Sequence, residues 1–335
     1  MTADKYGLEY VIREFYKEFK GYLKSAGIEI KGIRLRILES SNLLPKLSYM
    51  INTYDINKLK QELNTIDKSL LKQISNYDDI YIINKENLRE FYIGKIYLLR
   101  QIYNTDDIKE LNKKILEYVI HPIENEKLLG IGVSEIKEVY IIKDLLEKGI
   151  DKILNRLGPI NINRPSIIRL RRPLFDVVSA PLYTEGKNIK KDVAKVFAAN
   201  VIIHEMEHFI FGRGELENPE LSVSALQYIT YIDMYNLLKY PKTYEIIEEN
   251  IIACKKYIEN LTTFMGYLMV MGNFPKSLPK EYVNVFRRAP YNLGHCYANI
   301  IIDRNKKSSC LNIKDVVEEA KNLSILDALI KIRYY

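Results

Sequence analysis

The segment from Ala194 to Phe211 is the feature of this chain that most constrains its fold. It has the length of a helix, and apolar side chains surround it on nearly every side: Val193, Val196, Phe197, Val201, Ile202, Ile203, Met206, Phe209, Ile210 and Phe211. A helix that is apolar all round is buried, so other elements must pack around it. Yet the same segment contains the polar sequence His204-Glu205-Met206-Glu207-His208.

The spacing of these polar residues predicts a metal site. His204 and His208 are four residues apart, so their imidazoles lie on the same face of a helix, within reach of one metal ion. Glu205 points to a neighbouring sector, where it can act as a general base toward a water molecule at a zinc ion. Burying these groups without partners would be costly, and metal ligation offsets that cost. The alternative is a hydrogen-bonded histidine–glutamate pair in the core that binds no metal.

The sequence H-E-x-x-H at His204–His208 resembles the active-site helix of the zincin metallopeptidases, and the resemblance covers roughly residues 190–235. It implies that both histidines bind Zn²⁺ and that Glu205 activates the attacking water. The metzincin extension of the motif is absent, because Phe211 and Gly214 stand where its glycine and histidine would be. The resemblance is therefore to the gluzincin pattern, in which the third zinc ligand is a glutamate on a following helix.

The residues after the motif predict a turn and a second helix. Gly212 and Gly214 favour the end of the first helix and a turn. Asn218 is a suitable N-cap, and Pro219 suits the first helical position. We therefore expect a helix over residues 219–238.

Glu220 is the predicted third metal ligand. If the two helices are antiparallel, Glu220 in the first turn of the second helix lies roughly level with His208. Asp233 would lie about 20 Å along the second helix and overshoot the histidines. Glu217 and Glu215 remain alternatives. Acidic residues are also favoured in a first helical turn without any metal.

The segment Arg288–Tyr297 is the predicted source of a group that stabilises the oxyanion of a tetrahedral intermediate. Several helical zinc oligopeptidases have a similar tyrosine- and glycine-containing segment late in the chain. This similarity implies catalytic roles for Tyr291 and His295. Tyr228 and Tyr231, on the expected glutamate helix, compete for the same role, and a lone histidine in an apolar helix is often structural.

Composition limits the remaining possibilities. The 335 residues, 47% of them hydrophobic, can bury a large core. The net charge of +7 is spread among acidic neighbours, without the concentrated basic stripe of a nucleic-acid-binding protein. No apolar run reaches the roughly 18 residues of a membrane span, and the first residues lack a signal-peptide core. We therefore expect a cytoplasmic protein with neither a membrane nor a nucleic acid as partner.

Two further compositional features concern the cysteines and the source. Cys254, Cys296 and Cys310 show no C-x-x-C spacing, which implies neither a disulfide framework nor a cysteine–zinc site. Abundant Ile, Lys, Glu and Tyr with few Gln resemble the composition of a thermophile's proteins.

The periodicity predicts a mainly α protein with a small β-sheet, in the α+β class. We expect a mostly helical region over 1–157, of unassigned function, and a zincin-like catalytic region over 158–335, joined by the proline-containing linker Gly158–Pro165. His121 precedes a proline and is expected to end a helix. The segments 28–38 and 167–183 are expected to be extended. Helices are expected over 6–26, 41–75, 86–104, 106–119, 134–157, 187–211, 219–238, 243–272, 279–304 and 313–333, the last with a break.

The extended segment 167–183 lies just before the motif helix, where zincins place the strand that forms the upper rim of the cleft. By this resemblance it could bind a peptide or protein substrate through backbone pairing. Arg169 and Arg171 could then bind acidic residues or a terminal carboxylate of that substrate.

Two functions remain open at this point. The first is a zinc-dependent peptidase in which Glu205 is the general base. The second is a nucleic-acid-associated or interaction protein with a structural or vestigial zinc site. A structural site is closed by four protein ligands, and Cys296 beside His295 is the evident source of a fourth ligand.

Overall fold

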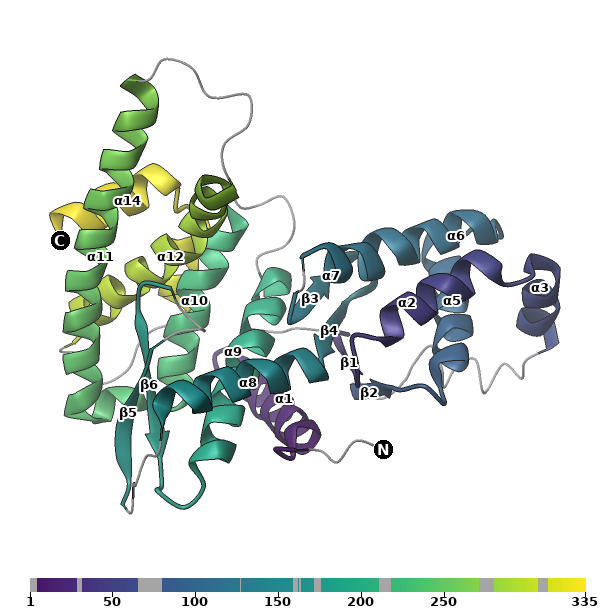
Figure 1. The fold of residues 1–335 in the computed structure, drawn as a ribbon, viewed down its shortest axis with the longest axis horizontal. Helices are drawn as coiled ribbons and strands as arrows, with labels where there is room; N and C mark the ends of the chain where they lie inside the picture. Colours follow the sequence, from purple (N-terminus) through teal and green to yellow (C-terminus); the bar gives the residue numbers. More distant parts are fainter. Residues whose placement is uncertain are drawn as a thin grey trace.

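The computed structural model describes residues 5–28, 32–65, 80–126, 128–158, 162, 164–171, 176–210, 218–270, 280–306 and 313–335. It confirms the predicted fold class, because helices dominate and the strands form one four-stranded sheet and one two-stranded hairpin. In Figure 1 the four-stranded sheet and its helices occupy one side of the molecule, and the C-terminal helices occupy the other.

The four-stranded sheet is mixed. Its strands are β1 (Arg34–Leu38), β2 (Ile80–Ile83), β3 (Gly130–Val133) and β4 (Glu138–Ile142), in the order β2-β1-β4-β3. Strand β1 is parallel to both neighbours, whereas β3 runs antiparallel to β4 at one edge. A 3₁₀ turn over Ser134–Ile136 joins these last two strands.

Part of this sheet differs from the sequence-based prediction. Residues 134–142 were expected to be helical, but they form the 3₁₀ turn and β4. Every residue of β4 is buried, and a short continuous apolar run cannot be distinguished from a buried helix by periodicity. Strand β2 was not predicted.

The helix expected over 41–75 is two helices, α2 (Leu43–Thr53) and α3 (Ile56–Thr65), and 66–79 lies outside the described residues.

The sheet separates two hydrophobic cores. Along β4, Val139 and Ile141 belong to the larger core, and Tyr140 and Ile142 belong to the smaller one. The smaller core includes α2, α5 (Leu88–Tyr103) and α6 (Ile108–Ile115).

The larger core joins both halves of the sequence. It contains side chains of α1 (Leu8–Ser25), α8 (Lys143–Leu157) and α9 (Ile189–Ile210). Hydrophobic packing therefore continues across the boundary expected between residues 157 and 158.

His121 does not end a helix. A π-helical turn, Leu116–Ile120, leads directly into α7 (His121–Glu126). Proline lacks a backbone N–H and cannot make the usual helical hydrogen bond, and the wider π turn just before Pro122 allows the helical path to continue. The expected helix end was therefore wrong.

The C-terminal half is a helical assembly. It contains α10 (Pro219–Met234), a 3₁₀ turn (Leu237–Lys239), α11 (Pro241–Val270), α12 (Lys280–Arg304), α13 (Ile313–Lys321) and α14 (Ile325–Tyr334). These bounds agree closely with the predicted helices. Across the described part of the chain, no helix is both long and apolar enough to cross a membrane.

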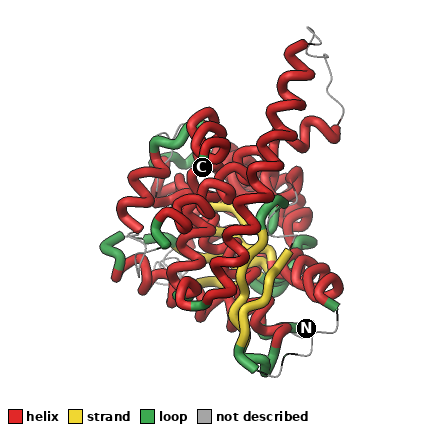
Figure 2. Tube along the Cα trace, turned by 90° about the vertical axis from the view of Figure 1, so that its left-hand side faces the viewer, coloured by secondary structure: helices red, strands yellow, loops and turns green. Residues whose placement is uncertain are grey.

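The extended segment 167–183 forms an antiparallel hairpin of β5 (Ser166–Arg171) and β6 (Ser179–Thr184). Figure 2 shows its two strands running across the outside of the helices. The hydroxyls of Tyr228 and Tyr231 in α10 donate hydrogen bonds to the carbonyls of Ser179 and Pro181, at 2.8 and 2.7 Å. These two tyrosines therefore attach the hairpin to α10.

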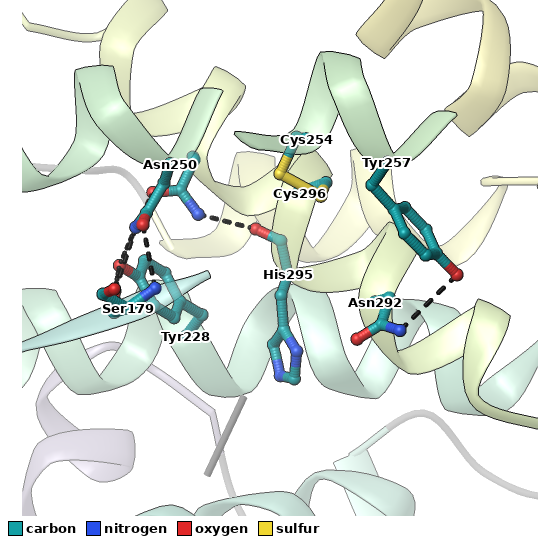
Figure 3. Close-up of a disulfide and its surroundings, with 9 residues drawn as sticks. Ser179, Tyr228, Asn250, Cys254, Tyr257, Asn292, His295 and Cys296 are labelled. Atoms are coloured by element: carbon teal, nitrogen blue, oxygen red, sulfur yellow. Dashed lines mark hydrogen bonds between the residues drawn. A yellow bond between two sulfur atoms is a disulfide. The ribbon is translucent and has the colours of Figure 1, made fainter. Parts of the chain in front are cut away.

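A disulfide joins Cys254 of α11 to Cys296 of α12 (Figure 3). The spacing of the cysteines gave no indication of it. The two residues are 42 positions apart, and only the packing of α11 against α12 brings their Cα atoms to 5.6 Å.

Candidate metal centre

Helices α9 and α10 bring together the three predicted metal ligands. Nε2 of His204 lies 3.3 Å from Oε2 of Glu220, and Nε2 of His208 lies 3.7 Å from Oε1 of the same carboxylate. A ring nitrogen of each histidine and a carboxylate oxygen of Glu220 all lie within 4.8 Å of one another. No other such group of histidine, cysteine or carboxylate side chains occurs in the described part of the chain.

The environment of the carboxylate fits a cation. Oε2 of Glu220 is buried and accepts no hydrogen bond of normal geometry, although His204 is close to it. Burial by itself would raise the pKa of Glu220, but the contact with His204 and the charges of both histidines lower it to about 2. The group is therefore an ionised carboxylate with a free coordination position, which suits a zinc ligand.

Of the alternative third ligands, the structure describes Asp233, which is not part of this cluster. Glu215 and Glu217 lie outside the described residues. Asp233 lies near the C-terminal end of α10, and its Oδ2 accepts a hydrogen bond of 2.7 Å from the hydroxyl of Tyr22 in α1. This hydrogen bond directs Asp233 toward α1.

Gln227 fixes the orientation of His204. Its Nε2 donates a hydrogen bond of 2.9 Å to the carbonyl of Asn200, so its Oε1 must be the atom 3.2 Å from Nδ1 of His204. Because Oε1 is an acceptor, Nδ1 of His204 carries the proton. The other ring nitrogen, Nε2, lies 3.3 Å from Oε2 of Glu220, and it is the nitrogen that can bind a metal once it has lost its proton.

His295 lies behind this arrangement. Its Nε2 is 3.4 Å from the same Oε1 of Gln227, and its ring contacts the ring of Tyr228. Burial lowers the pKa of His295 to about 3, so its imidazole is neutral. Figure 3 shows the imidazole pointing away from the adjacent disulfide. His295 is therefore a neighbour of Gln227 and is not among the clustered ligands.

Tyr291 lies directly at the cluster. Its ring stacks on that of His204, with the centroids 5.8 Å apart and an interplanar angle of 22°. Its hydroxyl forms a hydrogen bond that helps to lower the pKa of Glu220. Of the two residues predicted in α12, Tyr291 is the one that contacts the ligand set.

Glu205 contacts the edge strand of the four-stranded sheet. The backbone N–H of Gly132 in β3 donates a hydrogen bond of 2.7 Å to Oε2 of Glu205. Burial raises the pKa of Glu205, the negative charge of Glu220 raises it further, and His204 and the Gly132 hydrogen bond oppose the shift. A carboxylate with a raised pKa is a better proton acceptor near neutral pH.

The two predicted substrate-binding arginines are not beside Glu205. Arg169 in β5 forms an ion pair with Glu249 in α11, and both residues line, together with Arg171, a cavity that contains none of the candidate metal ligands. The strand in contact with the motif glutamate is β3, from the N-terminal region.

Cys296, the evident fourth ligand of a closed structural site, is not available for that role. Cys296 is bonded to Cys254, so its sulfur is not free to bind a metal. The described residues thus supply three ligands to this cluster.

Sequence inspection missed Gln227, Gly132 and Asn200. Gln227 follows Glu220 by seven residues, which is nearly two helical turns, so the shared face of α10 was a detectable signal. Gly132 is 73 residues from Glu205, and no local pattern indicates that contact.

Comparison of the chain with protein-family models, with curated proteins and with solved structures found no match.

Proposed function

We propose that this protein is a zinc-dependent peptidase. The observation that supports this most directly is the convergence of His204, His208 and Glu220 beside Glu205. Two imidazoles and one carboxylate are the ligands of several catalytic zinc sites, which leave a fourth position open. When bound, Zn²⁺ would supply Lewis-acid polarisation of a scissile carbonyl and acidify a water molecule.

The protein's own residues would then handle the proton. Glu205 accepts the proton of the attacking water and passes it to the leaving amine. The Gly132 N–H holds this carboxylate in one orientation. Tyr291 is the proposed donor to the developing oxyanion: its ring stacks on His204, and its hydroxyl, which is hydrogen-bonded to Glu220 in the metal-free protein, would turn from Glu220 to donate. We assign His295 a positioning role, because it contacts Gln227 and not the ligand atoms.

The substrate strand in this proposal is β3. Leu129 accepts a hydrogen bond from the backbone of Ile142 in β4, and successive residues of a strand face opposite edges. Gly130 and Gly132 therefore direct their backbone groups away from β4, and Gly132 faces Glu205. Because Glu205 holds the N–H of Gly132, a peptide added at this edge would pair with the remaining outward-facing backbone groups of Gly130 and Gly132, beside the proposed general base.

The location also belongs to the proposal. A buried disulfide is rare in the cytosol, but intracellular proteins of hyperthermophiles retain disulfides. A cytoplasmic peptidase of a thermophile agrees with both the disulfide and the composition. Detection of the Cys254–Cys296 disulfide by mass spectrometry in protein isolated from its native cells, alkylated at lysis, would test this location.

The decisive experiment combines metal analysis with hydrolysis. Protein loaded with zinc should contain about one zinc ion per chain and should release new amino termini from unfolded casein. The double variant His204→Ala/His208→Ala should lose both properties. Absence of bound metal after zinc loading would end the peptidase proposal.

A further inference from the structure

A cavity lined by arginines lies between the end of α8, the β5–β6 hairpin and α11. Its volume is about 580 Å³, which is within the range of sites for small molecules or peptide side chains. Arg156, Arg169 and Arg171 contribute positive charge, and Asp176 and Glu249 contribute negative charge. None of the candidate metal ligands lines it.

The two acidic residues of the cavity are already paired. Glu249 forms an ion pair with Arg169, which lowers the pKa of Glu249. Oδ2 of Asp176 lies 2.8 Å from a guanidinium nitrogen of Arg288 in α12. Arg156 and Arg171 form no ion pair with any residue that the structure describes. Arg156 and Arg171 are therefore the guanidinium groups of the cavity that no ion pair holds, although the charge of Arg171 also contributes to the lowered pKa of Glu249.

Hydrogen-bonded polar groups, those of Ser179 and Asn250, form part of the lining, which is here called the floor of the cavity. The side-chain amide of Asn250, which is 3% exposed, donates hydrogen bonds of 2.9 Å to the carbonyl of Ser179 and of 3.0 Å to the hydroxyl of Tyr228. Figure 3 shows this group of side chains beside His295. Because Tyr228 is adjacent to Gln227 in α10, the floor is attached to the helix that orients His204.

The cavity is also connected to the metal centre through α12. Asp176 on its wall binds Arg288. Arg288 precedes Tyr291 by three residues, a rise of about 4.5 Å along the helix, and Tyr291 stacks on His204. One helical turn of α12 thus separates a residue that binds the cavity wall from a residue at the proposed catalytic site.

We propose that this cavity binds a carboxylate of the substrate peptide. This inference rests on the peptidase function proposed above and adds the substrate class. The planar guanidinium of arginine matches a carboxylate through paired hydrogen bonds. The carboxylate can come from an acidic side chain or from the peptide's C-terminus. The experiment separates these two sources.

Binding is measured with a zinc-loaded Glu205→Gln protein, so that the peptides stay intact. Three fluorescein-labelled alanine peptides are compared by anisotropy at low salt: one with a central glutamate and an amidated end, one with glutamine and an amidated end, and one with glutamine and a free carboxylate. The first should bind best if the cavity takes an acidic side chain, and the third if it takes a terminal carboxylate. Either preference should be about tenfold or more over the neutral peptide.

Variants test whether the arginines cause that preference. Arg156→Gln and Arg171→Gln should each remove most of it, whereas Arg333→Gln, the same charge change at an exposed position of α14, should leave it intact. Arg171→Glu should instead favour a peptide with a central lysine, a gain that misfolding cannot produce. Equal binding of the three peptides, or no binding of any, overturns the carboxylate site.

The two proposals fail differently. If the wild-type protein cleaves peptides but neither binding nor kcat/KM depends on their carboxylates, the cavity proposal is wrong and the peptidase proposal stands. If acidic peptides bind through Arg156 and Arg171 but no peptide is ever cleaved, the carboxylate site stands and the peptidase function is wrong.

Discussion

Among individual residues, Glu205 provides the sharpest test of the proposed chemistry. It is close to the cluster but is not one of the clustered ligands, and its carboxylate is held by Gly132. Glu205→Gln should therefore keep zinc and fold, and should lower kcat for peptide hydrolysis by about 10²–10⁴-fold. Zinc content and kcat are measured on the same preparation. Loss of zinc in this variant would show that Glu205 is a ligand and that the assigned roles are wrong.

Gln227 should control zinc affinity without touching the metal. Gln227→Leu removes the acceptor for Nδ1–H of His204, and loss of such a partner lowers metal affinity by about 10–100-fold. Gln227→Glu keeps an acceptor oxygen and should retain more of the affinity. Competition titration with a zinc chelator gives the values, and Gln101→Leu, at an exposed position of α5, is the control. Unchanged affinity in Gln227→Leu would contradict the proposed positioning.

The pH dependence of zinc binding should follow His204. Burial alone would lower its pKa, but the contact with Glu220 and the charges of Glu205 and Glu220 raise it above 6.5 in the metal-free protein. Zinc binds the neutral imidazole. Zinc affinity should therefore fall as the pH drops, starting above pH 6.5, by up to about tenfold per pH unit for each proton. Isothermal titration at several pH values measures the zinc affinity. An affinity that does not change between pH 8 and pH 6 would exclude the proposed dependence on His204.

Between elements, the packing of α9 against β3 determines the position of Glu205. A Cβ atom at Gly132 would lie 2.8 Å from the carbonyl oxygen of Glu205 and 3.0 Å from the ring of Phe209. Gly132→Ala should therefore force β3 and α9 apart, destabilise the fold by about 1–3 kcal/mol and reduce hydrolysis. Urea unfolding and kcat/KM are the measurements.

Gly21→Ala is the matched control for this change. A Cβ atom at Gly21, in α1, would meet no atom within 4 Å. The replacement should stabilise the protein by about 0.5–1 kcal/mol, because alanine favours a helix over glycine. If Gly132→Ala behaved like this control, the close approach of β3 to α9 would not be a constraint.

Helices α9 and α10 cross, and this crossing determines which of their side chains meet. The candidate metal ligand Glu220 lies beside His208, but the hydroxyl of Thr230, ten residues later, donates a hydrogen bond of 2.9 Å to Glu207. In a simple antiparallel pair, Thr230 would face the beginning of α9. The helices therefore cross, and Glu220 reaches the histidines because it occupies the first turn of α10.

For the whole molecule, Glu138 is the critical buried charge. It lies in β4, between the two cores, and forms ion pairs with Lys95 of α5 and Arg36 of β1, all of them almost fully buried. Burial would raise the pKa of Glu138, but these cations lower it to about 2. Burial lowers the pKa of Lys95 to about 8, against the opposing effect of Glu138. The cluster is fully charged at neutral pH, because three cationic side chains, those of Lys95, Arg36 and Arg34, form ion pairs with one carboxylate.

Removal of the negative charge of Glu138 should strongly lower the free energy of unfolding of the whole molecule. Glu138→Gln leaves Lys95 and Arg36 buried without a counter-charge and should cost about 3–5 kcal/mol in urea unfolding. Asp106→Asn, in the exposed pair with Arg100, should cost little. The stability due to Glu138 is present above pH 4.5 and is lost as the pH falls toward 2, because the folded pKa is the lower one. A variant of wild-type stability would show that this cluster contributes nothing.

The sequence determined those features that depend on local spacing. Four-residue spacing places His204 and His208 on one face of a helix, and the Asn218-Pro219 start places Glu220 in the first turn of the next. The helix bounds of the C-terminal half followed from the same periodicity. Here each side chain's position depends on backbone geometry over a few residues.

The tertiary structure decided which distant segments meet. It placed Gly132 against Glu205, joined Cys254 to Cys296, and made a buried strand of residues 138–142, which the sequence pattern had indicated as helix. A strand that is buried on both faces has no alternation to reveal it, and contacts between distant residues depend on how whole elements pack. The proposed metal ligands are thus readable locally, whereas the strand beside them and the cavity are products of packing between elements far apart in the chain.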